Sequence, residues 1–472
     1  MTPLRLAPVD LLIVAIYLVG IFLIGLKYSG NYRGNIDEYL LAGRRLSLPA
    51  FVATMVSTWY GGILGVGEFT YRYGLLNWVT QGLPYYFFAI LFGIFLAPRI
   101  QRSGLYTIPD QLYQRYGKPA GFLGSVFVFL LTNPAPHLLM SALLISAIFG
   151  ISFWSAFLVG VTFSLFYVFV GGMKSDVLTD FFQFGLMFLG FGVMVVKLVT
   201  SYGGISFLQA NLPQNHLRFS GGENWQYILV WFFIAFWTFV DPGFYQRCYG
   251  ARSPQVARRG VLISVIFWLL FDMLTTTCGL YARALIPDIN PLMAFPKLGE
   301  IAMGDFWRGI FFVGLLATIT STLDSVSLLS AMTFGRDLFW RLKPNSNINR
   351  NTQIGFFVIV ALSILIILFL PSVVKIWYTC GTLFIPALLI PIICNFTTYK
   401  YKSSVMFTGM LGSFCATLIW FIIGMINGTV MEPVYLLNIQ PFFVGILSWL
   451  LFLPFLPYRV TVKTDRHKNS IN

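Results

Sequence analysis

Long apolar segments separated by short polar loops recur along the whole chain, and they constrain its fold more than any other feature. A helix needs about 20 mostly apolar residues to cross a bilayer. Hydrophobic residues make up 57% of the 472 residues and charged residues only 10%, against about a quarter in soluble domains. We therefore expect an all-α polytopic membrane protein, multi-pass in the lipid bilayer, with no sizeable soluble domain.

The hydropathy pattern predicts about 13 transmembrane helices. We expect the first to be a retained helix rather than a signal peptide, because no Ala-x-Ala cleavage site follows it. The predicted segments are 9–27, 48–75, 79–98, 119–149, 152–171, 177–200, 226–246, 259–284, 307–338, 352–371, 374–396, 403–427 and 437–457.

Basic residues gather in alternate loops. An N-out/C-in orientation places 23 of the 31 Lys and Arg residues in cytoplasmic segments, as the positive-inside rule requires. Membrane topology thus accounts for the net charge of +14, and we expect no nucleic-acid partner.

Two predicted spans contain helix-breaking residues. The second span includes the glycine-rich run 61–67, and each glycine costs a helix about 1 kcal/mol relative to alanine. The seventh contains Asp241, Pro242 and Gly243, and proline removes a helical hydrogen bond. Close helix packing through glycine is the alternative explanation. We favour broken helices, which in transporters bind solutes and ions near the bilayer midplane.

The spacing of the two breaks predicts the domain organisation. Without the first helix, they fall in the first and sixth of the next ten segments, as in a 5+5 inverted repeat. We expect one extra N-terminal helix and its cytoplasmic loop at 1–47, the first repeat at 48–200, the second, inverted repeat at 201–400, and two extra C-terminal helices with a cytoplasmic tail at 401–472.

Four acids lie inside the predicted spans, and the pattern places no Lys or Arg at mid-depth beside them. A charge in hydrocarbon is costly, so each acid is a functional candidate. An external cation could balance them, or some could be protonated. The role of Asp272 is left open. These acids are Asp180, Asp241, Asp272 and Asp324.

The ninth span is rich in small hydroxyl side chains. Four of them share one helical face because they recur at three- and four-residue steps, and Asp324 lies beside this face. Hard cations prefer such oxygen ligands. Hydroxyl contacts between helices are the alternative, and Asp324 favours the cation site. The four are Thr318, Ser321, Thr322 and Ser325.

Several motifs resemble the sodium:solute symporter family. They are residues 37–45 (DEYLLAGRR), residues 104–112 (GLYTIPDQL) with 115–117 (RYG), Gly171-Gly172 with Thr179-Asp180 and Gln183, and residues 321–325 (STLDS) followed by 336–338 (RDL). The matches are in the family's order and cover roughly residues 10 to 340.

The resemblance implies a LeuT-like fold with a sodium site between the first and eighth core helices. Its ligands would be backbone carbonyls of Met55, Thr58 and Thr318 and the hydroxyls of Ser321 and Thr322. Some members have a second sodium site, which would correspond here to Asp180, Ser321, Asp324 and Ser325. We expect sodium as the only metal and no cofactor.

The solute is not defined by the sequence. The polar pair of sugar-type members aligns with Gly61 and Gly62, which counts against a close copy of a sugar pocket. Candidate residues of the solute cavity are Trp59, Tyr60, Glu68, His137, Trp237, Asp241, Tyr245 and Tyr378.

The predicted function is therefore sodium-coupled import of a small polar organic solute by alternating access across the plasma membrane, the inner membrane in a bacterium. A proton-coupled symporter of the same fold is the alternative, and a transport-derived sensor is a weaker one. We expect neither enzymatic activity nor an obligate protein partner.

Overall fold

The computed structural model describes residues 3–27, 35–397, 399, 401–429 and 433–455. The predicted cytoplasmic tail, residues 456–457 of the last predicted segment and residues 28–34 of the first loop lie outside the described residues. The described chain is helical, apart from turns, loops and one isolated bridge between Leu46 and Ala251. The prediction of an all-α protein is confirmed.

The helices follow one another with mostly short connections, and four of the described α-helices begin at a capping side chain followed by proline. Ser47, for example, accepts the Ala50 N–H and precedes a helix with proline in its first turn. In chain order the α-helices are α1 (Pro8–Lys27), α2 (Ile36–Leu41), α3 (Leu48–Ser57), α4 (Ile63–Tyr73), α5 (Leu83–Leu91), α6 (Ala97–Arg102), α7 (Ile108–Leu131), α8 (Ala135–Phe149), α9 (Phe153–Tyr202), α10 (Ile205–Asn211), α11 (Trp225–Ile234), α12 (Trp237–Val240), α13 (Pro242–Gly250), α14 (Pro254–Leu285), α15 (Ala294–Ala302), α16 (Trp307–Met332), α17 (Ile348–Phe369), α18 (Val373–Asn395), α19 (Ser403–Asn427) and α20 (Pro441–Ser448).

Fewer helices than the predicted 13 have the length and hydropathy of a membrane span. Among the described residues, ten helices are long and apolar enough to cross a membrane, or up to eleven if the bent pair Leu48–Tyr60 and Ile63–Tyr73 forms one span. Part of the difference lies in α9, which joins the predicted segments 152–171 and 177–200 into one element of 50 residues. The rest lies near the C-terminus, where the apolar helix Pro441–Leu451 is short.

Gly172 divides α9. Its φ of +60° is in the left-handed region, and a Cβ at this position would lie 2.2 Å from the Tyr39 carbonyl oxygen. Only glycine fits this conformation and this contact. A straight helix of this length would extend about 75 Å, more than twice the hydrocarbon core. The kink at Gly172 therefore allows the two halves of α9 to run in different directions.

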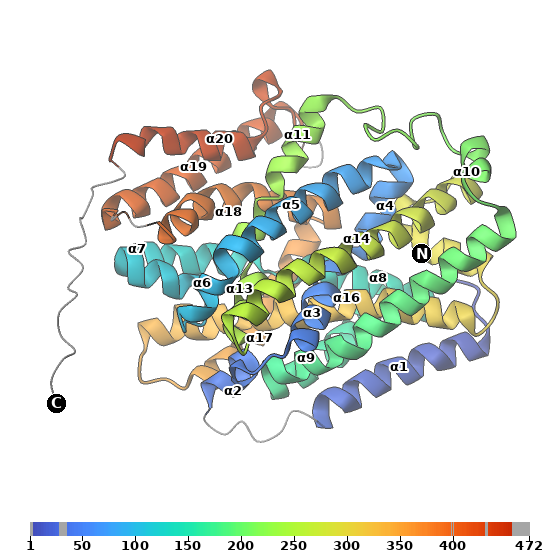
Figure 1. The fold of residues 1–472 in the computed structure, drawn as a ribbon, viewed down its shortest axis with the longest axis horizontal. Helices are drawn as coiled ribbons and strands as arrows, with labels where there is room; N and C mark the ends of the chain where they lie inside the picture. Colours follow the sequence, from blue (N-terminus) through green and yellow to red (C-terminus); the bar gives the residue numbers. More distant parts are fainter. Residues whose placement is uncertain (1–2, 28–34, 398, 400, 430–432, 456–472) are drawn as a thin grey trace.

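The centre of the molecule is formed by α16, which packs against α9, α8 and α17. The first helix and the last two α-helices lie at opposite edges: α1 at the lower edge in Figure 1, and α19 and α20 at the upper edge. The structure thus surrounds α16 with helices from both halves of the chain.

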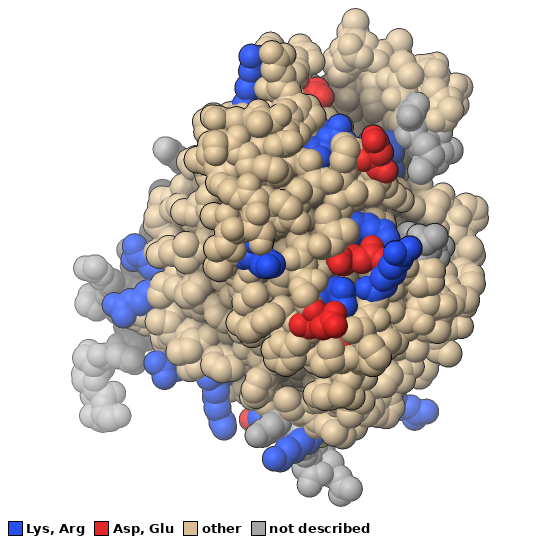
Figure 2. Space-filling model, turned by 90° about the vertical axis from the view of Figure 1, so that its right-hand side faces the viewer, with Lys and Arg blue, Asp and Glu red and all other residues tan. Residues whose placement is uncertain are grey.

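Charged side chains are sparse on the surface. Figure 2 shows one end of the molecule, where a few Lys and Arg side chains lie beside Asp and Glu and most other atoms belong to uncharged residues. Over the whole chain, only 10% of the residues are charged, which suits a protein that is largely embedded in lipid.

Candidate cation and solute site

The first predicted break is present. Helix α3 is followed by the 3₁₀ turn η2 (Thr58–Tyr60) and a turn at Gly61 and Gly62. The chain then continues as α4, at an angle of 55° to the first part of the span. A Cβ on Gly61 would lie 2.1 Å from the Thr322 Cβ, and one on Gly62 would lie 2.3 Å from the Trp377 ring. The glycines therefore let the broken turn lie directly against α16 and α18.

The second predicted break is also present. Asp241 is extended, with φ −74° and ψ 113°, between α12 and α13. Its Oδ1 accepts the backbone N–H groups of Gly243 at 2.7 Å and Phe244 at 3.3 Å. Pro242 occupies the first turn of α13, where its missing N–H costs nothing. Asp241 is thus the N-cap of the helix that follows the break.

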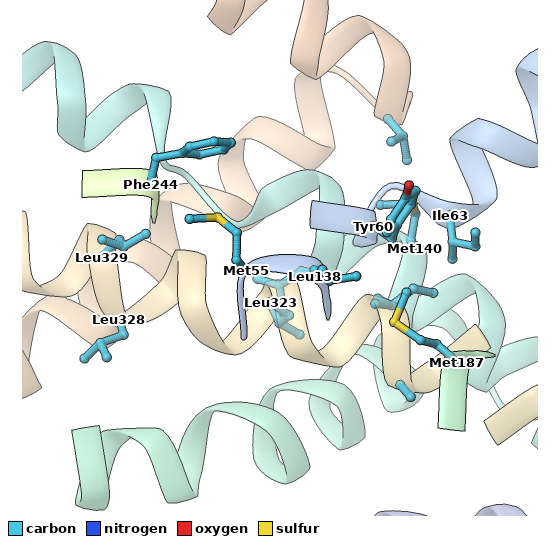
Figure 3. Packing of buried hydrophobic residues seen from close by; sticks show 14 of the residues in the cluster. Met55, Tyr60, Ile63, Leu138, Met140, Met187, Phe244, Leu323, Leu328 and Leu329 are labelled. Atoms are coloured by element: carbon cyan, nitrogen blue, oxygen red, sulfur yellow. The ribbon is translucent and has the colours of Figure 1, made fainter. Parts of the chain in front are cut away.

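The first break contacts the hydroxyl-rich face of α16. The Thr322 hydroxyl donates to the Thr58 carbonyl at 2.6 Å and lies 3.4 Å from the Thr318 carbonyl. The Ser321 hydroxyl donates to Asp180 Oδ1 at 2.5 Å. Met55 is buried, and Figure 3 shows its side chain near Phe244, Leu323 and Leu329. The five residues of the first predicted sodium site therefore lie along one contact between the broken span and α16.

The second predicted cation group has a different arrangement. Asp180 and Ser321 are hydrogen-bonded, whereas Asp324 Oδ2 accepts a hydrogen bond from the Tyr167 hydroxyl. The Ser325 hydroxyl donates to Asp176 Oδ2 at 2.8 Å. Asp176 is absent from the sequence-based candidates, although it lies four residues before Asp180 and thus on the same helical face.

Arg247 corrects another expectation, since the sequence pattern placed no basic residue beside the buried acids. Its Nη2 lies 3.6 Å from Asp176 Oδ2 and 3.9 Å from Asp180 Oδ2, and all three side chains are buried. The predicted segment ended at residue 246 and assigned Arg247 to a cytoplasmic loop, but α13 continues to Gly250. The extra helical turn directs the guanidinium inward.

A cavity of about 250 Å³ lies between the two breaks. Its walls come from the broken spans and from α5, α7, α8, α14, α16 and α18. Six of the predicted solute-cavity residues line this cavity: Trp59, Tyr60, His137, Trp237, Asp241 and Tyr378. Asp272, whose role the sequence left open, also lines it.

The two other predicted cavity residues have partners elsewhere. Glu68 pairs with Arg72 at 3.2 Å, one turn further along α4. The Tyr245 hydroxyl donates to the Phe239 carbonyl at 3.1 Å, and the residue is fully buried. These contacts give Glu68 and Tyr245 roles in local structure.

The cavity walls are aromatic with a few polar groups. The Trp59 ring lies 5.0 Å from both the Tyr85 and Trp268 rings, measured between centroids. His137 Nδ1 lies 3.3 Å from the Gly61 carbonyl, within the first break. The Tyr86 hydroxyl donates to Asp272. Such a mixture of apolar walls and fixed polar groups is typical of small-molecule sites.

Two broken spans, an oxygen-rich contact beside one of them and a cavity between them define a membrane transporter of the LeuT-like fold. Solved structures agree. A Na⁺-coupled sialic acid symporter in a substrate-bound outward-open state matches with a TM-score of 0.78 and 15% identity, over 94% of this chain and 96% of that one. Mhp1, a nucleobase-cation-symport-1 family transporter, matches with a TM-score of 0.54 and 12% identity, over 89% and 94%.

The chain belongs to the sodium:solute symporter family, whose model matches residues 39–379. The sodium/pantothenate symporter of Escherichia coli is 25% identical over 66% of this chain and 68% of its own length. The human sodium/iodide cotransporter is 27% identical over 57% of this chain and 43% of its own length. The sodium/glucose cotransporter of Vibrio parahaemolyticus is 24% identical over 74% of this chain and 72% of its own length. This chain is a sodium-coupled solute symporter of the cell membrane, not an enzyme.

Proposed function

We propose that the coupling sodium ion binds between the first break and α16. Its ligands are the carbonyl oxygens of Met55, Thr58 and Thr318 and the hydroxyls of Ser321 and Thr322. The hydrogen bond of 2.6 Å from the Thr322 hydroxyl to the Thr58 carbonyl carries the proposal. This bond shows that the Thr58 carbonyl, at the broken turn, faces the hydroxyl-rich side of α16. Small hard cations prefer carbonyl, hydroxyl and carboxylate oxygens as ligands.

Asp180 supplies the negative charge beside this site. It accepts hydrogen bonds from Ser321 on α16 and from Thr54 on α3, so it joins both walls of the proposed site. Sodium bound here would attract Asp180, α3 and α16 at once. The ion would therefore stabilise the arrangement in which the first break and α16 are in contact.

We propose that a small polar organic solute binds in the cavity between the breaks and is imported by alternating access. In the proposed topology, 13 spans with an N-out/C-in orientation place the tail in the cytoplasm. The membrane potential adds about 2.3 kcal/mol per charge per 100 mV to the driving force. Movement of the broken spans past α16 would expose the cavity first outside and then inside.

Thermal unfolding of the purified protein in sodium and in potassium tests the sodium site. Sodium should stabilise the wild type. Ser321→Ala removes a ligand to a charged group, worth about 1.5–3 kcal/mol, so the half-saturating sodium concentration should rise roughly 10- to 100-fold.

Ser327→Ala is the matched control, because Ser327 is buried on the same helix and its hydroxyl has no hydrogen-bond partner among the described residues. It should respond to sodium as the wild type does. An S321A protein with unchanged sodium stabilisation contradicts the proposed site. Solute uptake that persists without sodium and follows pH would favour the proton-coupled alternative.

A further inference from the structure

The Arg247 guanidinium lies among the oxygen atoms that a second cation would need. Its Nη2 donates to the hydroxyls of Ser325 at 2.6 Å and Thr58 at 2.8 Å. The same nitrogen lies 3.1 Å from the Thr54 hydroxyl. It also lies 3.6 and 3.9 Å from the nearest oxygens of Asp176 and Asp180. One nitrogen of Arg247 therefore contacts three hydroxyls and faces two carboxylates.

These contacts overlap with the second predicted cation group. Ser325 and Asp180 belong to that group, and both face the guanidinium. Arginine keeps its positive charge in proteins, and a buried charge requires paired and hydrogen-bonded neighbours. The two carboxylates and three hydroxyls fulfil this requirement. A sodium ion at the same oxygens would lie against a like charge.

We propose that Arg247 fills the second cation site of this symporter, so that the protein binds one sodium ion and not two. The inference rests on the proposed first sodium site. The guanidinium belongs to α13, which follows the second break, whereas its carboxylate partners belong to α9. The positive charge at the second cation site is thus part of the protein itself, since it belongs to α13, the helix that follows the second break.

Arg247 is also a positioning residue for the first site. Thr58 receives the Thr322 hydroxyl at its carbonyl oxygen and the Arg247 guanidinium at its side-chain oxygen. The two contacts fix Thr58 from both sides. The proposed sodium ion and the guanidinium therefore share Thr58 and Asp180 as neighbours.

Equilibrium binding of radiolabelled sodium to the purified full-length protein counts the ions. One ion per wild-type protein is the expected result. Two ions would overturn the proposal that Arg247 fills the second site. Sodium binding that is absent altogether, while solute still stabilises the protein, would overturn the proposed first site, so the two failures are distinguishable.

Substitution of Arg247 tests the competition directly. R247Q leaves Asp176 and Asp180 without their positive partner, and the variant should bind a second sodium ion. R247K keeps the charge and should bind one. R252Q, two residues after α13 at an exposed position, is the control and should also bind one.

A folded R247Q protein that binds a single sodium ion overturns the proposal. If R247Q does not fold, the wild-type ion count decides the question on its own. The binding count separates this role from a purely structural one, because general destabilisation would lower the amount of folded protein without adding a binding site.

Discussion

Asp10, in the first turn of α1, pairs with Arg308 in the first turn of α16, with 2.6 Å between Oδ2 and Nη2. Asp10 Oδ1 also accepts the backbone N–H groups of Phe306 and Gly309, each at 3.0 Å. Phe306 is the N-cap residue of α16 and has no side-chain acceptor of its own. A carboxylate from α1 therefore caps α16, the central helix of the transporter.

Asp10→Ala should lower the stability of the protein by about 3 kcal/mol, because it removes the buried one of the two carboxylates that pair with the Arg308 guanidinium and leaves two backbone N–H groups without their acceptor. Thermal unfolding in detergent measures the loss. Asp305→Asn is the control, since Asp305 binds the same arginine at 2.6 Å but its side chain is 67% exposed. Exposed pairs contribute at most about 1 kcal/mol. Equal effects of D10A and D305N would contradict the capping role.

Gly61→Ala should weaken sodium binding roughly tenfold or more. The new methyl group would lie 2.1 Å from the Thr322 Cβ, so the break and α16 must move apart. Sodium titration followed by thermal unfolding measures the change. Gly185→Ala is the control, because an added Cβ there meets no atom within 4 Å. An unchanged sodium response in G61A would show that the Thr58–Thr322 contact is not required for binding.

Asp272→Asn should reduce solute binding about tenfold or more and leave sodium binding intact. Asp272 lines the cavity, and a hydrogen bond to a charged group contributes about 1.5–3 kcal/mol. The probe is the solute that stabilises the wild type best in a panel of sugars, carboxylates and organic cations. Tyr86→Phe keeps the carboxylate but removes its hydroxyl donor, and should have a smaller effect. Loss of the sodium response in D272N would instead indicate a role in ion binding.

His216 should make stability depend on pH. Burial lowers the pKa of His216, in the loop between α10 and α11, below its usual value of 6.5, and its Nε2 lies 3.1 Å from the Tyr71 carbonyl. The folded protein therefore favours the neutral imidazole. This contribution is present above pH 6.5 and decreases as the pH falls toward the lowered pKa. His216→Gln should flatten the dependence of the unfolding temperature on pH in this range, and an unchanged profile would assign it to other groups.

The broken spans could be predicted because their causes are local. Gly61, Gly62 and Pro242 disfavour a continuous helix wherever they occur in a span, and the structure has breaks at both positions. The family resemblance and the LeuT-like fold could be predicted for the same reason, since they rest on motifs in a fixed order. These features needed no knowledge of tertiary contacts.

The partners of the buried acids could not be predicted in the same way. Arg247 pairs with acids on α9 because α13 extends one turn beyond the hydropathy boundary, and such boundaries are the least reliable part of a sequence-based assignment. Asp324 contacts Tyr167 because α16 packs against α9, and this packing is a tertiary contact. The count of long apolar helices differs from 13 because the predicted segments 152–171 and 177–200 form one element that is kinked at Gly172, and because the helix Pro441–Leu451 is short.

The tight fit around Gly61 and Gly62 limits how this transporter could acquire a new specificity. Thr322 and Trp377 already fill the space that side chains at these two positions would need. A polar side chain at Gly61 would require a change at Thr322, and one at Gly62 would require a change at Trp377. A new solute preference would therefore arise more readily through single changes at cavity-wall residues that are not proposed sodium ligands, such as Trp237 and Tyr378.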